Sequence, residues 1–403
     1  MDYCLVCYAE LKPFFDLGPQ PSANCLVEKH DLGNEEYIYP LQLGYCEKCK
    51  NVQTLTRTEK EEMFGETYSY FTSANQPMIE HFADTAGIIK DRFHKENFFI
   101  VEMGSNDGVF LKNFSDGHHL GIEPSKNVAF SARENGISCW TDFFNFATAN
   151  RIVEDHGKAD VVFAANVFAH VEDINSIVNG IKILLKPDGV FIFEIYYLPQ
   201  MVQMNSFDLI YDEHIFFYTL TNLKNLFDRY DLEVFDIDHL SVHGGSIRGY
   251  VSHTGKYAKS RTYLDAFFKE QEQGYNSIDP LMGFSEHAAK VRTDLKALLA
   301  KLREEGKKVI GYGATAKSTT ILNFCDINSD DIACIVDSTP FKQGKYTPGK
   351  NIEIRPESEF MEINADYTIL FAWNYADIIM EKNKAYSDKG GKWILMHPEV
   401  RVI

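Results

Sequence analysis

Two Cys-x-x-Cys pairs near the N-terminus constrain the fold of this 403-residue chain more than any other feature. Cys4 and Cys7 form the first pair, and Cys46 and Cys49 form the second after 38 intervening residues. Each pair can turn two thiolates toward one ion, and four thiolates complete the closed tetrahedral shell of structural zinc. A small region with few strong apolar segments gains stability from such a metal. We therefore expect one structural zinc ion and no catalysis at it.

Two other interpretations of these cysteines remain as alternatives. Unligated cysteines can pack as small hydrophobic residues. A redox role would place a pair after a strand in a thioredoxin-like βαβ unit, and neither pair has that setting. The remaining cysteines are scattered, and in a reducing cytosol this spacing favours metal over disulfide.

Composition and charge argue against several classes of protein. Hydrophobic residues make up 45% and charged residues 24%, the balance of a folded globular protein. No apolar run approaches the roughly 18 to 20 residues of a membrane span, and the first residues lack a signal-peptide pattern. We therefore expect a cytoplasmic protein without a membrane partner. The net charge of −18 and the lack of a basic stripe argue against nucleic acid, but not against an anionic small molecule.

The pattern along the chain predicts an α/β protein of three domains. Residues 1–75 hold the zinc-binding module and a turn-rich stretch at 17–21. Residues 76–255 alternate strands and helices in the pattern of a doubly wound, Rossmann-like α/β domain. A helical connector at 256–304 leads to a second Rossmann-like α/β domain at 305–403.

Short apolar runs between turn signals locate the expected strands of both α/β domains. In the middle domain they span 98–103, 120–123, 159–164 and 190–194, with helices at 126–135 and 174–185 and a turn at 185–189. In the last domain the expected strands span 308–312, 332–337, 367–371 and 392–396.

A glycine loop at 102–108 directly follows the first strand of the middle domain and opens a helix. Gly104 allows a tight turn beside a ligand, and Gly108 allows close packing where the helix begins. Glu123 ends the next strand, where a carboxylate can bind both hydroxyls of a ribose. Together these features predict a cofactor that contains a nucleoside.

S-adenosylmethionine suits this loop better than NAD does. Asn106 occupies the second glycine position of the dinucleotide fingerprint, and S-adenosylmethionine has no pyrophosphate that needs a close backbone approach. Asp142 and Phe143 are candidates to bind and stack an adenine. The other candidates for cofactor binding are Glu102, Asp107 and Asn166. An NAD-binding Rossmann domain remains the alternative.

The segment Tyr211-Asp212-Glu213-His214 is the candidate reaction site. A histidine beside two carboxylates can act as a general base near neutral pH, and a nearby tyrosine can donate to a developing oxyanion. Further on, the glycines of segment 243–248 allow close backbone approach, and Arg248 is a candidate to meet an anion. The alternative for each cluster is a solvated loop.

A second glycine loop opens the last domain at 311–317. Backbone N–H groups at the start of the following helix, together with Lys317, would suit a pyrophosphate. Asp337 ends the next expected strand, where it could meet the ribose or base. The alternative is a second dinucleotide domain that holds NAD.

In their order along the chain, these motifs resemble one known family. The chain is similar over essentially its whole length to C-methyltransferases that act on nucleotide-linked 4-keto-deoxysugars, such as those of tetronitrose and other branched-sugar pathways. The resemblance includes the four cysteines, the loop at 102–108, Tyr211-Asp-Glu-His214, the segment at 243–248 and the loop at 311–317.

The resemblance implies how such a chain would act. The sugar nucleotide, with dTDP the favoured carrier, would lie between the methyltransferase and C-terminal domains, bound by His243, Ser246, Arg248, Tyr312, Lys317 and Asp337. His214 would remove the proton from C3, beside the C4 ketone, with Tyr211 and Glu213 nearby, and the enolate carbon would attack the methyl group. Tyr68 or Tyr70 would approach the keto group, and the choice between them stays open.

Two other functions stay open at the level of sequence. An O- or N-methyltransferase acting on another small molecule would need no carbon acid. A zinc-stabilised protein that binds a sugar nucleotide without turnover would need no base. Neither the identity of the sugar nor the oligomeric state follows from the sequence.

Overall fold

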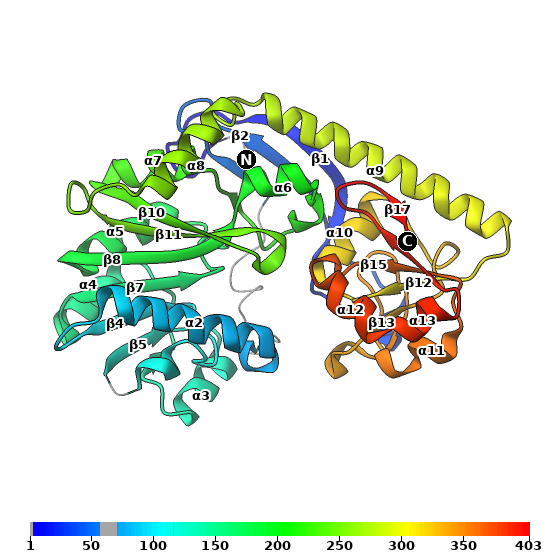
Figure 1. Cartoon of the computed structure of the whole chain (residues 1–403), viewed down its shortest axis with the longest axis horizontal. Helices are drawn as coiled ribbons and strands as arrows, with labels where there is room; N and C mark the ends of the chain where they lie inside the picture. The colour runs from blue at the N-terminus through cyan, green and yellow to red at the C-terminus, as the bar shows by residue number, and fades with distance from the viewer. Residues whose placement is uncertain (1–2, 57–70, 116) are drawn as a thin grey trace.

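The computed structural model describes residues 3–56, 71–115 and 117–403, which form sheets of four, seven and six strands. Figure 1 shows the seven-stranded and six-stranded sheets on opposite sides, with the N-terminal strands and the long helix α9 (Asp279–Glu304) along the top. This arrangement confirms the expected α/β class with two Rossmann-like sheets. No described helix is long and apolar enough to cross a membrane.

The four-stranded sheet is antiparallel, in the order β1 (Lys12–Pro21), β2 (Ile38–Tyr45), β3 (Val52–Thr54), β9 (Phe216–Phe217). Strand β9 follows the candidate reaction segment and pairs with β3 through Val52 and Phe217. The turn expected at 17–21 is instead part of β1, because the pairing with β2 shifts register between Asp16 and Pro19 and absorbs the irregular residues.

The seven-stranded sheet has five parallel strands and an antiparallel pair at one edge. Its order is β10 (Leu232–Leu240), β11 (Ser246–His253), β8 (Leu185–Tyr196), β7 (Ala159–Ala165), β4 (Phe99–Met103), β5 (His118–Ile122), β6 (Cys139–Trp140). The associated helices are α2 (Gln76–Phe93), α3 (Lys126–Glu134), α4 (Phe146–His156), α5 (Ile174–Leu184), α6 (Leu198–Met204) and α7 (Leu220–Phe227).

The turn expected at 185–189 lies inside β8. Leu185 already pairs with Ala159 of β7, and pairing resumes from Val190 to Val161 after a register shift. A strand can take up extra residues as a bulge without ending, so the Pro-Asp-Gly sequence interrupts the pairing but not the strand.

The six-stranded sheet is parallel apart from its last strand. Its order is β14 (Ile354–Pro356), β13 (Ile335–Asp337), β12 (Val309–Tyr312), β15 (Tyr367–Leu370), β16 (Lys392–Leu395), β17 (Arg401–Val402). Its helices are α10 (Ala316–Phe324), α11 (Phe360–Ile363), α12 (Ala376–Lys382) and α13 (Lys384–Asp388).

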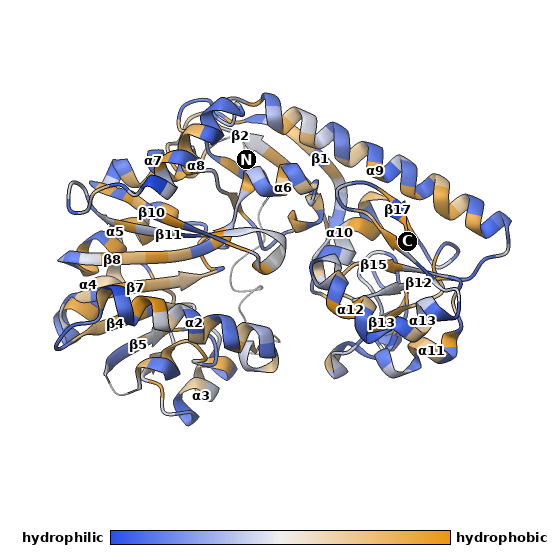
Figure 2. Ribbon diagram, viewed as in Figure 1, coloured by the Kyte–Doolittle hydropathy of each residue, from blue (hydrophilic) through white to orange (hydrophobic). Residues whose placement is uncertain are grey.

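Helices α8 (Arg261–Glu272) and α9 connect the two large sheets. The buried residues of α9 recur at helical spacing, from Leu281 and Phe284 to Leu299 and Leu302, and Figure 2 shows the helix as alternating hydrophobic and hydrophilic bands. Phe15 of β1 packs edge-on against Phe284 at 5.4 Å between ring centroids. The N-terminal sheet, α9 and the C-terminal domain thus share one core. The residue limits predicted for the domains stay predictions.

Candidate active site

The four N-terminal cysteines converge on one point. Their Sγ atoms all lie within 4.8 Å of one another, and all four residues are buried. Each pair forms the same turn: the N–H of Tyr8 donates to the Cys4 carbonyl, and that of Lys50 to the Cys46 carbonyl, both at 2.8 Å, with positive φ at Tyr8 and Lys50. Four buried sulfurs at this separation fit a tetrahedral zinc ion and leave no open position.

The glycine loop after β4 is packed too tightly for side chains at two positions. A Cβ at Gly104 would lie 2.4 Å from Val167 Cγ2, and one at Gly108 would lie 2.6 Å from Ile137 Cγ1, and both glycines have positive φ. The loop is also held by the short 3-10 helix that precedes α2, because the N–H of Thr72 donates to Asn106 Oδ1 at 2.8 Å and that of Ser73 to Asp107 Oδ2.

Two buried carboxyl groups lie beside this loop. Glu123 accepts the backbone N–H groups of Asn106 and Ser125 at 3.0 and 2.8 Å, and burial raises the pKa of its carboxyl group. Burial and the neighbouring Glu123 and Asp107 hold the pKa of Glu102 well above its ordinary value. Both residues line a cavity of about 1950 Å³ that also contacts the second glycine loop and is called the main cavity below. Both are therefore placed to meet the polar groups of a cofactor.

The other predicted cofactor residues divide into two groups. Gly104, Asn106, Phe143 and Asn166 line the same cavity as Glu102 and Glu123. The Asp142 carboxylate instead pairs with Arg151 of α4 at 2.8 Å.

The candidate base is held by a short loop between α6 and β9. His214 is 2% exposed, and its Nδ1 lies 2.6 Å from the carbonyl oxygen of Leu209. A carbonyl only accepts, so Nδ1 carries the proton and Nε2 is the nitrogen that can accept one. The Tyr211 ring packs against the imidazole with 4.0 Å between centroids and an angle of 36° between the ring planes. Tyr211, Glu213 and His214 all line the main cavity.

A second histidine accompanies His214. His170 lies after β7, with its ring centroid 4.9 Å from that of His214, and it lines the cavity. Burial lowers the pKa of His170 to about 4, so this ring is neutral at physiological pH. Sequence reasoning missed it, although its position four residues after Asn166 at the carboxyl edge of the sheet was a usable signal.

The C-terminal domain supplies the opposite wall. Tyr312, Lys317 and Asp337 line the main cavity. Asp337 accepts the backbone N–H groups of Ala314 and Thr339 at 2.7 and 2.8 Å, and Lys317 Nζ donates to Asn374 Oδ1 at 2.6 Å. Burial lowers the pKa of Lys317, partly offset by Asp208. The cavity between these walls has a volume of about 1950 Å³.

The comparisons with known proteins cover the whole chain. Family models match residues 4–64 as a zinc binding domain, 77–237 as a methyltransferase domain and 241–398 as a C-methyltransferase C-terminal domain. The chain is 31% identical over 408 aligned residues to the C-methyltransferase NovU of Streptomyces niveus, covering 100% of this chain and 97% of that protein. The chain belongs to the C-methyltransferase family.

Solved structures match part of this C-methyltransferase. An S-adenosylmethionine-dependent methyltransferase from Clostridium acetobutylicum has 14% identity, a TM-score of 0.36, and covers 44% of this chain and 92% of its own. Magnesium protoporphyrin IX methyltransferase from Synechocystis, with bound SAH, has 10% identity, a TM-score of 0.35, and covers 48% and 92%.

The family assignment settles the cofactors. This C-methyltransferase uses S-adenosylmethionine as methyl donor. Its cysteine cluster, matched by the zinc binding domain, is a structural zinc site. The sequence expectation of S-adenosylmethionine over NAD is confirmed, as is the zinc.

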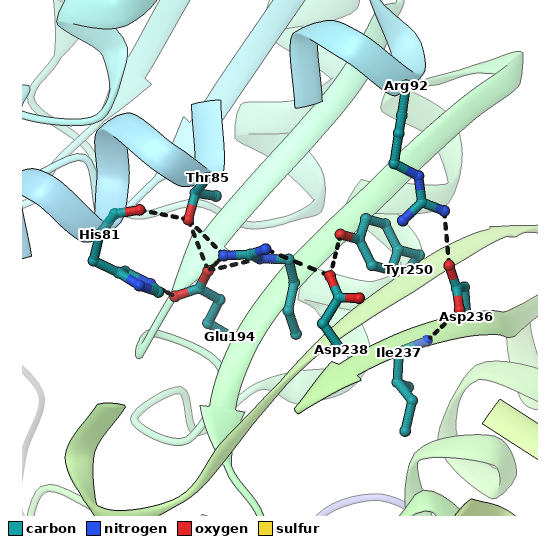
Figure 3. A network of polar contacts seen from close by, with 9 residues as sticks. His81, Thr85, Arg92, Glu194, Asp236, Ile237, Asp238 and Tyr250 are labelled. Carbon is teal, nitrogen blue, oxygen red and sulfur yellow. Dashed lines mark hydrogen bonds and ion pairs between the residues drawn. The ribbon is translucent and has the colours of Figure 1, made fainter. Parts of the chain in front are cut away.

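Arg248 belongs to a buried polar network. Its guanidinium lies 2.8 Å from a carboxylate oxygen of Glu194 and also donates to Thr85 of α2. Figure 3 shows the polar network around Glu194, with His81 and Thr85 on one side and Asp238 and Tyr250 on the other. His81 Nε2 lies 2.6 Å from the other Glu194 oxygen. Arg248 is 3% exposed, so its charge is used inside the protein. A charged group this deeply buried needs a partner, and Glu194 is that partner here. The contact between Arg248 and an anion of the substrate stays a prediction.

The remaining predicted residues are placed as follows. Ser246 lies at the start of β11 and lines a small pocket of about 300 Å³, separate in its lining from the main cavity. Tyr68, Tyr70 and the side chain of His243 lie outside the described residues. The roles given to all these site residues stay predictions.

Proposed function

We propose that this C-methyltransferase adds a methyl group to C3 of a nucleotide-linked 4-keto-deoxysugar. The observation that carries the proposal is the fixed tautomer of His214, which directs a basic nitrogen into a cavity lined by both glycine loops. A base that is positioned between a methyl-donor site and an anion site suits a substrate with an acidic C–H and a phosphate.

The proposed reaction divides among residues of the cavity wall. His214 Nε2 takes the C3 proton, and the hydroxyl of Tyr211 donates to the enolate oxygen at C4, without which an imidazole is too weak a base for a carbon acid. S-adenosylmethionine supplies an already activated methyl group. Neutral His170 adds a polar ring without adding positive charge beside the imidazolium that forms. Glu213 precedes the base in the same loop, and Tyr68 or Tyr70 stays a candidate for the keto group.

We further propose that the C-terminal wall binds the nucleotide. The start of α10 and Lys317 would hold the diphosphate, because backbone N–H groups and an ammonium favour an anion. Tyr312 and Asp337 would contact the nucleoside, which we expect to be dTDP-linked. Ser246 and His243 stay candidates for contacts near the sugar.

Three assignments of the whole chain complete the proposal. The domain limits are residues 1–75, 76–255, 256–304 and 305–403. The protein acts in the cytoplasm, where a reducing environment keeps thiolates available to zinc. The glycine-loop carboxylates of Glu102 and Asp107 and the carboxylate of Glu123 after β5 contact S-adenosylmethionine, together with Gly104, Asn106, Phe143 and Asn166. Asp142 acts only indirectly, through its pair with Arg151.

Mass spectrometry of a panel of 4-keto-deoxysugar nucleotides, incubated with the protein and S-adenosylmethionine, tests the proposal. We expect one panel member to gain the mass of one methylene group, with the new methyl carbon at C3 by NMR. Methylation at an oxygen or nitrogen, or of no panel member, would overturn the proposed substrate and leave the family assignment intact.

A further inference from the structure

The loop that carries the candidate base, residues 205–215 between α6 and β9, is called the reaction loop here. A short segment of the N-terminal region, residues 22–24, holds it in place. The hydroxyl of Ser22 donates to Asp212 Oδ2 at 2.6 Å, and the N–H of Ala23 donates to Asp212 Oδ1 at 3.0 Å. The next residue, Asn24, donates from its side-chain amide to Glu213 Oε1. Both carboxylates before His214 are thus bound by residues almost 200 positions earlier, at sequence separations of 189 or 190.

Helix α10 of the C-terminal domain contacts both this segment and the reaction loop. The hydroxyl of Thr319, on α10, donates to the carbonyl of Ala23 at 2.9 Å, and that of Thr320 donates to the carbonyl of Ile210 at 3.0 Å. Segment 22–24 therefore lies between the reaction loop and α10, and its residues line the main cavity. Its position is determined by both neighbours, which is what a precisely oriented contact needs.

The two contacts to the carboxylates differ in kind. Asp212 is buried and satisfied at both oxygens, as expected of a structural clamp. Glu213 lines the cavity, and Asn24, its donor, is exposed to that space. Only the second contact is positioned to affect the reaction directly.

We propose that Asn24 is a positioning residue for methyl transfer: its amide orients an ionised Glu213 carboxylate beside His214. The proposal rests on the proposed function of His214 as base. An ionised carboxylate at this position stabilises the imidazolium that forms when His214 takes a proton. A protonated Glu213 would lose that attraction, so the rate follows the ionised fraction of Glu213.

The surroundings of Glu213 make the Asn24 contact decisive. Burial raises the pKa of Glu213 to about 7, the Asn24 amide lowers it and the charge of Asp212 raises it. The other titratable groups near it are Tyr39 of β2 and His170, whose ring contacts the Glu213 backbone and lies 4.9 Å from the His214 ring between centroids. Among the residues that the structure describes, no cationic side chain forms an ion pair with Glu213, and the hydrogen bond from the neutral Asn24 amide favours its charged form.

Removal of this donor moves the acid limb of the pH–rate profile. Loss of a hydrogen bond to a charged group, weakened here by the exposure of Asn24, should move the acid midpoint of the profile by about one pH unit. We expect Asn24→Ala to shift the acid midpoint upward by about one unit, to lose about fivefold in rate at pH 7, and to approach the wild-type rate near pH 9. A variant that only loosened the fold would lose rate at every pH and keep its midpoint.

The experiment is a double-mutant cycle on the full-length zinc-loaded protein, with methyl transfer to the panel substrate measured from pH 5.5 to 9. The variants are Asn24→Ala, Glu213→Gln and the double variant, with Asn34→Ala as matched control, since Asn34 is an exposed asparagine of the same region that donates only to Asp31. Each profile is normalised to its own plateau, so that a loss of folded protein changes the amplitude and not the midpoint.

We expect Glu213→Gln to abolish the acid limb near pH 7 and Asn24→Ala to have no further effect in that background. Additive losses in the double variant, or an unmoved midpoint in Asn24→Ala, would overturn the role of Asn24. Failure of the wild type to methylate any panel member would instead overturn the proposed substrate, so the two failures are distinguishable.

Discussion

At the scale of single residues, His214 owes its proposed role to one hydrogen bond of its own ring. The carbonyl of Leu209 holds Nδ1, so Nε2 is the nitrogen that can accept a proton, and His214 lines the main cavity. His170 lies beside it, but burial keeps the pKa of that ring at about 4, too low for a base that has to act near neutral pH. The local environment thus distinguishes the proposed base from a neutral neighbour in the same cavity.

Replacement of His214 by asparagine tests this assignment. Asparagine keeps a polar side chain of similar reach but cannot take a proton, so we expect a loss of about a hundred- to ten-thousandfold in methylation. Exchange of the sugar C3 proton with solvent deuterium, measured with S-adenosylhomocysteine bound, should fall by the same factor. Unchanged cofactor affinity serves as control, and a loss below tenfold would assign the base to another group.

Glu123 offers a test of the cofactor site that does not depend on the sugar. Its carboxylate lies at the end of β5, bound by two backbone N–H groups and lining the cavity. A hydrogen bond to a charged group contributes about 1.5–3 kcal/mol, so Glu123→Ala should weaken S-adenosylmethionine binding by about tenfold or more. Calorimetry measures this directly, with Asp142→Ala as control, since Asp142 pairs with Arg151 and should change affinity little.

At the scale of elements, the zinc knuckles and the reaction loop belong to one sheet. Strand β3 begins three residues after Cys49, and it pairs with β9, which begins two residues after His214. The zinc site is therefore connected through two short strands to the proposed base. A metal that takes no part in chemistry can still affect the active site through this connection.

Loss of zinc should accordingly reduce activity as well as stability. We expect Cys46→Ser to abolish stoichiometric zinc in elemental analysis and to loosen the N-terminal sheet, while the two larger sheets stay folded by circular dichroism. Hydrogen exchange should increase in β3 and β9 together. Cys25→Ser is the matched control, because Cys25 is exposed and outside the cluster. Full zinc content in Cys46→Ser would contradict the four-cysteine site.

At the scale of the whole molecule, a buried polar contact joins the reaction loop to the C-terminal domain. Asp208 accepts the indole N–H of Trp373 at 2.7 Å and lies 3.2 Å from His397 Nε2. Burial alone would raise the pKa of Asp208, but His397, Lys317 and Trp373 together hold it below its ordinary value. The ionised carboxylate is therefore more stable in the folded protein than in the unfolded chain.

This shift has a definite sign for stability. A carboxyl group with a lowered pKa adds stability above its unfolded pKa, about 4, and that stability is lost as the pH falls through the lower folded value. We expect Asp208→Ala to lower the free energy of unfolding at pH 7 by about 3–5 kcal/mol, because His397 and Trp373 lose a buried partner. Denaturant titration measures this, and the difference from wild type should shrink below pH 4. Asp330→Ala, at an exposed aspartate, is the control.

Several parts of this C-methyltransferase could be predicted because they depend on neighbours in the chain. The cysteine knuckles are turns closed within five residues, so spacing alone identified them. The glycine loop and Glu123 follow from a strand that precedes a turn and from the next parallel strand. Helices and strands of the two large sheets came from local periodicity, with errors where bulges in β1 and β8 carried a strand through residues typical of turns.

Other features depend on contacts between residues that lie far apart in the sequence, and only the tertiary structure reveals them. Arg248 pairs with Glu194 because β8 places that carboxylate opposite it in the sheet, a neighbour that the sequence alone does not indicate. Asn24 carries no motif, and its contact with Glu213 joins residues 189 positions apart. Short-range patterns therefore specify which chemistry the chain carries. Desolvation and long-range packing specify which of its charged groups remain available to perform it.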